Sequence, residues 1–126
     1  MGADDLVPSE FDVYTLVVLR RPDSAPEMTD EDLEQLQLRH LAYRSQLREQ
    51  GLTAANGPMR LQSDDSYRGM TIFTCDPREA TRLSDADPSV IAGRLTFDVM
   101  EWWVPADSLA FPNSSRPVGA RRALSN

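Results

Sequence analysis

The alternation of apolar and polar residues along the chain predicts four strands. Residues 11–20, FDVYTLVVLR, are rich in β-branched and aromatic side chains, and both faces of this extended segment are apolar. A strand with apolar side chains on both faces must be buried on both faces, so we expect this strand at the centre of a sheet. Three further strands are predicted within residues 52–62, 69–75 and 95–104.

A long helix is predicted between the first two strands. Thr29 and Asp32 have the spacing of a capping box, and the first turn that follows is acidic. Gly51 comes after a polar run and is the expected left-handed residue beyond the helix, since glycine adopts positive φ without steric penalty. The helix therefore begins near Asp30 and has about six turns.

The inner face of this helix carries the chain's single histidine. At about 100° per residue, His40 lies near the middle of the apolar sector and Arg44 at its edge. The apolar members of the sector are Leu33, Leu36, Tyr43 and Leu47. An unpaired polar group in a protein interior costs about 1–3 kcal/mol, so a buried His40 needs a hydrogen-bond partner. The helix alone is compatible with a packed core or interface histidine and with a catalytic base.

Two Asp-Pro pairs predict the starts of two short helical segments. Aspartate is a preferred N-cap, and proline is tolerated in the first turn because its missing N–H would have no helical partner there. The first pair predicts a helix over residues 77–86. The second predicts a short helix or turn that Asp87 caps and Gly93 closes.

The order of these elements predicts one α+β domain over residues 11–105, with the ferredoxin-like arrangement βαββαβ and an antiparallel sheet. We expect a flexible tail over residues 1–10 and a partly disordered tail over residues 106–126. Helices would cover one sheet face only, so we expect a homodimer through the open sheet face. Trp102 and Trp103 point to opposite faces, which predicts one in the core and one against the partner subunit.

Composition narrows the setting of this domain. The chain has 126 residues, 40% of them hydrophobic and 26% charged, and no apolar run approaches the roughly 20 residues of a membrane span. A net charge of −7 disfavours nucleic acid as a partner, because its phosphates would be repelled. An acidic amino-terminal segment and a single cysteine indicate a cytoplasmic protein.

The residue types available also limit the chemistry. All 13 basic residues are arginine, so a Schiff base on lysine is excluded. One histidine with scattered carboxylates makes a poor transition-metal site, and we expect neither a metal nor a cofactor. Cys75 has no second histidine to activate it, which disfavours a nucleophilic mechanism.

Two stretches of the sequence resemble the YCII-related family. They are HLAYRSQLREQGLTAANGPM, which begins at His40, and DADPSVIAGR, which contains Asp87; the resemblance extends over residues 13–103. It implies a dimeric α/β barrel of ferredoxin-like subunits, similar to the muconolactone isomerase architecture. It also implies a pocket with a catalytic His-Asp pair, which maps onto His40 and Asp87. Met70 and Ser89 depart from the family pattern and would reshape the pocket.

Such a pair suits proton transfer to or from a small activated carbon acid. Asp87 would accept a hydrogen bond from one imidazole nitrogen, and the other nitrogen would take or deliver the proton. This chemistry serves a lyase, an isomerase or a dehydrohalogenase. The alternative is a non-catalytic dimeric protein that binds a small-molecule ligand or regulates through the same scaffold. Asp87 also has a purely structural interpretation, as the N-cap before Pro88.

Four further residues are candidates for substrate binding. Arg44 has the charge to bind a carboxylate or phenolate, although a surface ion pair with a glutamate is the simpler interpretation. Tyr43 has a hydroxyl that can donate a hydrogen bond, or it serves packing alone. Gly57 and Pro58 would bend or bulge the second strand and either form a pocket wall or make a plain turn.

Overall fold

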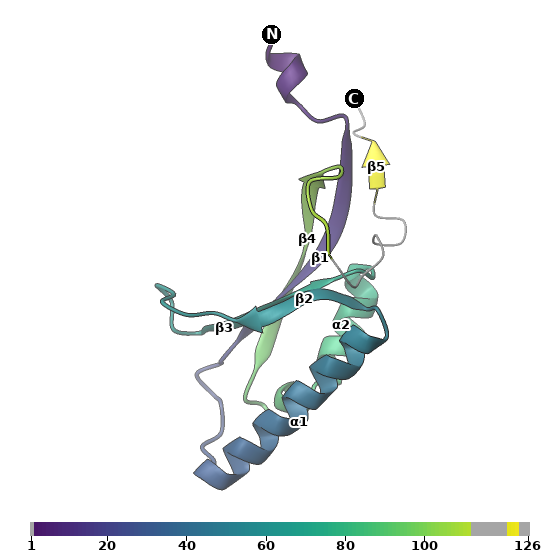
Figure 1. Ribbon diagram of the computed structural model, residues 1–126. Coiled ribbons are helices and arrows are strands. Elements are labelled where there is room, and N and C mark those ends of the chain that lie inside the picture. Colours follow the sequence, from purple (N-terminus) through teal and green to yellow (C-terminus); the bar gives the residue numbers. More distant parts are fainter. Residues whose placement is uncertain (1, 112–120, 124–126) are drawn as a thin grey trace.

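The computed structural model describes residues 2–111 and 121–123 of the chain (Figure 1). A short 3₁₀ helix, Ala3–Leu6, precedes the domain. The elements that follow are β1 (Glu10–Arg20), α1 (Asp30–Glu49), β2 (Thr53–Pro58), β3 (Tyr67–Phe73), α2 (Pro77–Asp85), α3 (Pro88–Ile91), β4 (Thr96–Pro105) and β5 (Arg121–Ala123). The prediction of an α+β, ferredoxin-like arrangement is confirmed, with the second helical segment divided into α2 and α3.

The sheet is antiparallel and has the strand order β2-β3-β1-β4, with β5 paired to the start of β1. The long strand β1 lies between β3 and β4, as its two apolar faces predicted. In β2 the register shifts between Thr53 and Ala55, ahead of the predicted bend at Gly57 and Pro58. Both long helices lie on the same side of the sheet (Figure 1), which leaves the other side uncovered by helices.

The helix boundaries follow from local chemistry. Thr29 Oγ1 accepts a hydrogen bond from the Asp32 N–H at 3.1 Å, and Gly51 after the helix has φ +75°. The side chain of Asp76 caps α2 by accepting from the Glu79 N–H at 2.8 Å. These helix ends are therefore where the sequence predicted them, because the capping residues act on backbone groups only a few positions away.

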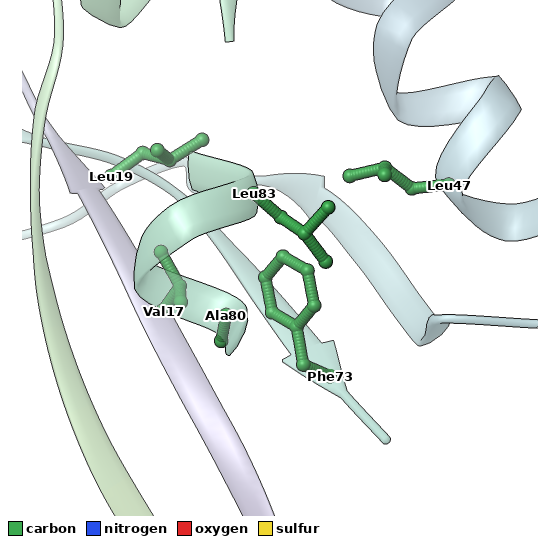
Figure 2. Close-up of a cluster of buried hydrophobic side chains, with 6 residues drawn as sticks. All are labelled: Val17, Leu19, Leu47, Phe73, Ala80 and Leu83. Carbon is green, nitrogen blue, oxygen red and sulfur yellow. The ribbon is translucent and has the colours of Figure 1, made fainter. Parts of the chain in front are cut away.

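The main core lies between the helices and the sheet. Figure 2 shows Leu47 of α1 and Leu83 of α2 directed towards Phe73 of β3, which is fully buried. Val17, Leu19 and Ala80 complete this cluster. Burying side chains of this size contributes roughly 1.5–3 kcal/mol each. The core thus fixes α1 against the sheet at its carboxyl end, and the amino-terminal half of the helix remains free to form the wall of a cavity.

The other sheet face carries a smaller apolar cluster. Its members are Tyr14, Ile72 and Val104, with Leu16, Ala54 and Phe111 against them. Met100 and Trp102 on β4 remain 42% and 40% exposed. The prediction that one tryptophan enters the core is wrong, because Trp103 is also 38% exposed and packs on Phe11 at 5.6 Å between ring centroids. Trp102 packs on Tyr14 at 6.5 Å between ring centroids, so each indole contacts an aromatic side chain of β1 and stays partly exposed.

The predicted tails contain some regular structure. The 3₁₀ helix lies within residues 1–10, and β5 within residues 106–126 pairs with Glu10, Phe11 and Asp12. A strand of three residues is too short to show an alternation of apolar and polar positions in the sequence. The remaining residues of the carboxyl-terminal tail, 112–120 and 124–126, lie outside the described part of the chain. Within that part, no helix combines the length and the apolar character that a membrane crossing requires.

Candidate functional site

A cavity of about 610 Å³ lies between the inner face of α1 and the helix-facing side of the sheet. Its lining includes Leu36, Gln37 and His40 from α1, Asn56 and Pro58 from β2, and Gly69 from β3. Ser89 and Arg94 close it on the side of α3. This volume falls within the range of about 300–1,000 Å³ that small-molecule sites occupy. Gly57 and Pro58 contribute to the wall, as one of their two interpretations proposed.

His40 and Asp87 contact each other at this wall. His40 Nδ1 lies 2.8 Å from Oδ2 and 2.9 Å from Oδ1 of Asp87, whose side chain is fully buried. An ionised carboxylate can only accept, so Nδ1 carries the proton and donates it. In the neutral ring, Nε2 is then the basic nitrogen. It has no hydrogen-bond partner among the residues the structure describes, and His40 lines the cavity.

The position of Asp87 is set by its second role as the N-cap of α3. Its Oδ1 accepts a hydrogen bond from the Ser89 N–H at 2.8 Å. Pro88 sits in the first turn of α3, so the chain must arrive there in an extended conformation. The cap therefore holds the carboxylate rigidly while its remaining lone pairs face α1. The structural and the candidate catalytic interpretations of Asp87 are geometrically compatible.

Arg44 is buried and pairs with Asp87, which differs from the prediction of a surface arginine. Its side chain is 3% exposed, and Nε donates to Asp87 Oδ2 at 2.9 Å. The expected surface ion pair with a glutamate is therefore wrong. Arg44 does not line the cavity, so it lies behind Asp87 and has no direct access to a ligand there. The sequence could not reveal this pairing because the two residues are far apart in the chain and meet only when α3 packs on α1.

A chain of hydrogen bonds continues from Arg44 back to the cavity. Arg44 Nη1 donates to Thr71 Oγ1 at 3.3 Å, and Thr71 Oγ1 donates to Asn56 Oδ1 at 2.7 Å. The directions follow from the atoms in contact, because a guanidinium has no acceptor and an amide oxygen has no proton to donate. The Asn56 oxygen thus accepts one hydrogen bond, and the NH₂ group of Asn56, which lines the cavity, has no hydrogen-bond partner among the described residues. Sequence reasoning missed Asn56 and Thr71, which carry no distinctive spacing.

Tyr43 lies outside the cavity. The Tyr43 hydroxyl donates to the Leu83 carbonyl oxygen at 2.7 Å, and Tyr43 does not line the cavity. The structure thus gives Tyr43 the packing role, joining α1 to α2.

A Cβ atom added at Gly69 would lie 3.0 Å from the Gly57 carbonyl oxygen. Because Gly69 has no side chain, the backbone of β2 can approach β3 closely at this edge of the cavity.

The electrostatics of the site favour an ionised Asp87. Burial by itself would raise the pKa of the Asp87 carboxyl, but the hydrogen bond and charge of His40, the charge of Arg44 and the Ser89 N–H together hold that pKa below its usual 3.8. Elsewhere, burial raises the pKa of the Cys75 thiol to about 11, so it is not a ready nucleophile. Within the described ranges, no three His, Cys, Asp or Glu residues gather as a metal site would require.

Comparison with known proteins shows a likeness to solved structures. The sequence matches no protein-family model, and no curated protein matches it significantly. A solved structure that resembles it is 5-chloro-2-hydroxyhydroquinone dehydrochlorinase from Burkholderia phenoliruptrix AC1100, in complex with 2,5-dihydroxybenzoquinone. The TM-score is 0.48 and the sequence identity 20%, over 71% of this chain and 92% of that one. No family is assigned by these matches, and the chemistry of the cavity follows from its own residues.

Proposed function

We propose that this protein is a small-molecule enzyme in which His40 transfers a proton to and from carbon. The observation that carries this proposal is the buried carboxylate of Asp87, which accepts from His40 Nδ1 at 2.8 Å beside a cavity of about 610 Å³. The two sequence stretches that resemble the YCII-related family supply His40 and Asp87, which supports a distant relation to that family.

The reaction begins with a carbon acid whose acidic C–H lies next to a carbonyl group. His40 Nε2 takes the proton, the C–H electron pair forms a new C=C bond, and the carbonyl π electrons move to oxygen to give an enolate. Where the enolate is conjugated with a second C=C bond, return of the proton to its γ carbon shifts the double bond and completes an isomerisation. Expulsion of a halide or hydroxide from the neighbouring carbon completes an elimination, and the enolate oxygen reforms the carbonyl. Asp87 stabilises the imidazolium formed in between without taking its proton.

Asn56 is suited to hold the oxygen on which negative charge develops. Its side-chain oxygen accepts from Thr71, and its NH₂ group is available to donate to a ligand. A fixed donor of this kind stabilises an enolate more than the uncharged carbonyl, because it need not reorient as charge appears. His40 and Asn56 therefore take complementary roles, proton acceptor and oxyanion donor, and the Asp87–Arg44–Thr71 chain connects them.

The tautomer of His40 tests the proposed pairing directly. We expect the neutral ring to carry its proton on Nδ1, because the Asp87 carboxylate accepts there and cannot donate. ¹⁵N–¹H correlation spectra at a pH of about 8.5, well above the ordinary histidine pKa of about 6.5, report which nitrogen is protonated. His40 is the chain's only histidine, so its signals are unambiguous in an untagged protein.

The matched variant is Asp87→Asn, whose side-chain amide presents both a donor and an acceptor. It is expected to relax the preference for the Nδ1–H tautomer. A wild-type ring protonated on Nε2, or spectra unchanged by Asp87→Asn, would remove the basis for Nε2 as the base.

We also propose that two chains associate through the open sheet face. Support comes from its apolar cluster of Tyr14, Ile72 and Val104 and from the exposed Met100 and Trp102 beside it. The variant Trp102→Asp is expected to shift the protein to a monomer, because a charge would be desolvated in such an interface. Sedimentation equilibrium measures the mass. Leu61→Asp, at a loop residue that is 98% exposed, is the control expected to leave it unchanged; a wild-type monomer would contradict the proposal.

A further inference from the structure

Three arginines from separate segments converge on the lining of the cavity. Arg21 follows β1, Arg68 lies in β3 and Arg94 comes after α3. Arg94 Nη1 donates to the Pro26 carbonyl oxygen at 2.9 Å, and Arg68 Nη1 approaches the Asp65 carbonyl oxygen at 3.4 Å. Neither contact involves a carboxylate. Among the described residues, none of the three guanidinium groups forms an ion pair.

Among the described residues, three arginines outside the cavity form ion pairs, and Arg39, Arg48, Arg60 and Arg78 form none. Arg20 pairs with Asp64 and Asp98, Arg44 with Asp87, and Arg82 with Glu79. Acidic residues are plentiful, since the chain has 20 against 13 basic ones. A lack of carboxylates therefore does not explain why the arginines of the cavity are unpaired.

The local charge of the cavity is opposite to that of the whole chain. Glu34 is the one acidic residue in the lining, against Arg21, Arg68 and Arg94, while the chain carries a net charge of −7. Burial lowers the pKa of the Arg21 guanidinium, and the charges of Arg68 and Arg94 lower it further. The three like charges therefore line one cavity together, and each disfavours the others. An anion bound among them would relieve that repulsion, and a cleft lined by one sign of charge concentrates ligands of the other.

We propose that the ligand of this cavity is a small organic carboxylate, held by Arg21, Arg68 and Arg94. A planar carboxylate matches the forked donors of guanidinium groups. Leu33, Leu36 and Leu41 of α1 provide the apolar surface for the rest of the molecule. This inference rests on the proposed function for its substrate role: the anchored carboxylate would present a carbon acid to His40. It also replaces Arg44, which is enclosed behind Asp87, as the anion-binding arginine.

Binding of benzoate and its neutral isostere benzamide tests the proposal without any reaction. Isothermal titration calorimetry on the full chain is expected to give at least tenfold tighter binding of benzoate. Arg68→Gln and Arg94→Gln are each expected to weaken benzoate binding about tenfold, since a hydrogen bond between charged groups is worth about that factor or more. Benzamide binding should not change. Higher salt should weaken benzoate binding selectively, because Arg21 and Arg68 are exposed to solvent and salt screens their charges.

The control variant is Arg82→Gln, on the exposed side of α2 and outside the cavity, which is expected to leave benzoate binding unchanged. Equal binding of benzoate and benzamide, including no binding of either, would overturn the proposal. An equal loss in Arg82→Gln and Arg68→Gln would also overturn it. Benzoate carries no C–H on the carbon next to its carboxylate, so its binding is measured independently of proton transfer by His40. A failure of proton transfer would therefore leave benzoate recognition intact, and the two proposals fail separately.

Discussion

Replacing Asp87 with alanine is expected to lower the free energy of unfolding by about 3–5 kcal/mol, because it leaves the Arg44 guanidinium buried without its counter-charge. The carboxylate is fully buried and accepts from His40, Arg44 and the Ser89 N–H at once. A domain of this size is stable by only about 5–15 kcal/mol, so the loss is a large part of the total. Urea denaturation followed by circular dichroism measures it, through a lower midpoint at an unchanged slope.

Asp76→Ala is the matched control for this change. Asp76 is also an N-cap before a proline, but it is exposed and pairs with no buried charge, so about 1 kcal/mol is expected. The double variant Asp87→Ala with Arg44→Met removes the stranded charge as well and is expected to recover part of the loss. Equal effects of Asp87→Ala and Asp76→Ala would show that the buried network contributes nothing beyond capping.

The same carboxylate gives this contribution a defined pH dependence. The pKa of Asp87 is lowered in the folded protein, so its stabilisation is complete above the unfolded value of about 3.9. It is lost as the pH falls below that value through the lower folded pKa. Asp87→Asn, which keeps an oxygen for the Ser89 N–H, should therefore lie closest to wild type in acid and fall furthest below it near neutrality. The reverse trend would contradict the direction of the pKa shift.

Replacing His40 with asparagine is expected to reduce enzyme-catalysed proton transfer by roughly 10²–10⁴-fold, the usual contribution of a positioned general base. Asparagine places its amide near the position of Nδ1, so the hydrogen bond to Asp87 can persist while the basic Nε2 is removed. Exchange of carbon-bound hydrogen for deuterium in D₂O, followed by proton NMR, detects the first step without knowledge of the product. 4-Oxopentanoate is a suitable first substrate, since it joins a ketone carbon acid to a carboxylate.

Two comparisons separate the role of His40 as a base from a general effect on the cavity. Gln37→Ala changes a neighbouring residue of the cavity wall that cannot act as a base, and it is expected to retain far more exchange than His40→Asn. Equal exchange in wild type and His40→Asn would contradict the proposed role of His40. A wild-type protein that binds carboxylates through its arginines and exchanges none of their hydrogens would instead be a binding protein.

Most of the fold was predictable from the sequence because it depends on local rules. Thr29 and Gly51 bound α1 through backbone groups within one turn, and the two-sided apolar pattern of residues 11–20 put β1 at the centre of the sheet. Short-range capping also placed Asp87 at the start of α3. The exceptions are β5 and the two exposed tryptophans. Backbone pairing leaves no periodic pattern in the sequence, and the exposure of each indole depends on how the neighbouring strands lie.

The composition of the site was decided by the tertiary structure. By itself, the sequence determined the helix that carries His40 and the cap that carries Asp87. Only the packing of α3 on α1 brought Arg44 behind Asp87, where burial makes its charge structural and removes it from the ligand. Only the register of β2 with β3 set Asn56 beside Thr71. Arg21, Arg68 and Arg94 likewise come to line one cavity through folding alone, because they lie on three separate segments of the chain.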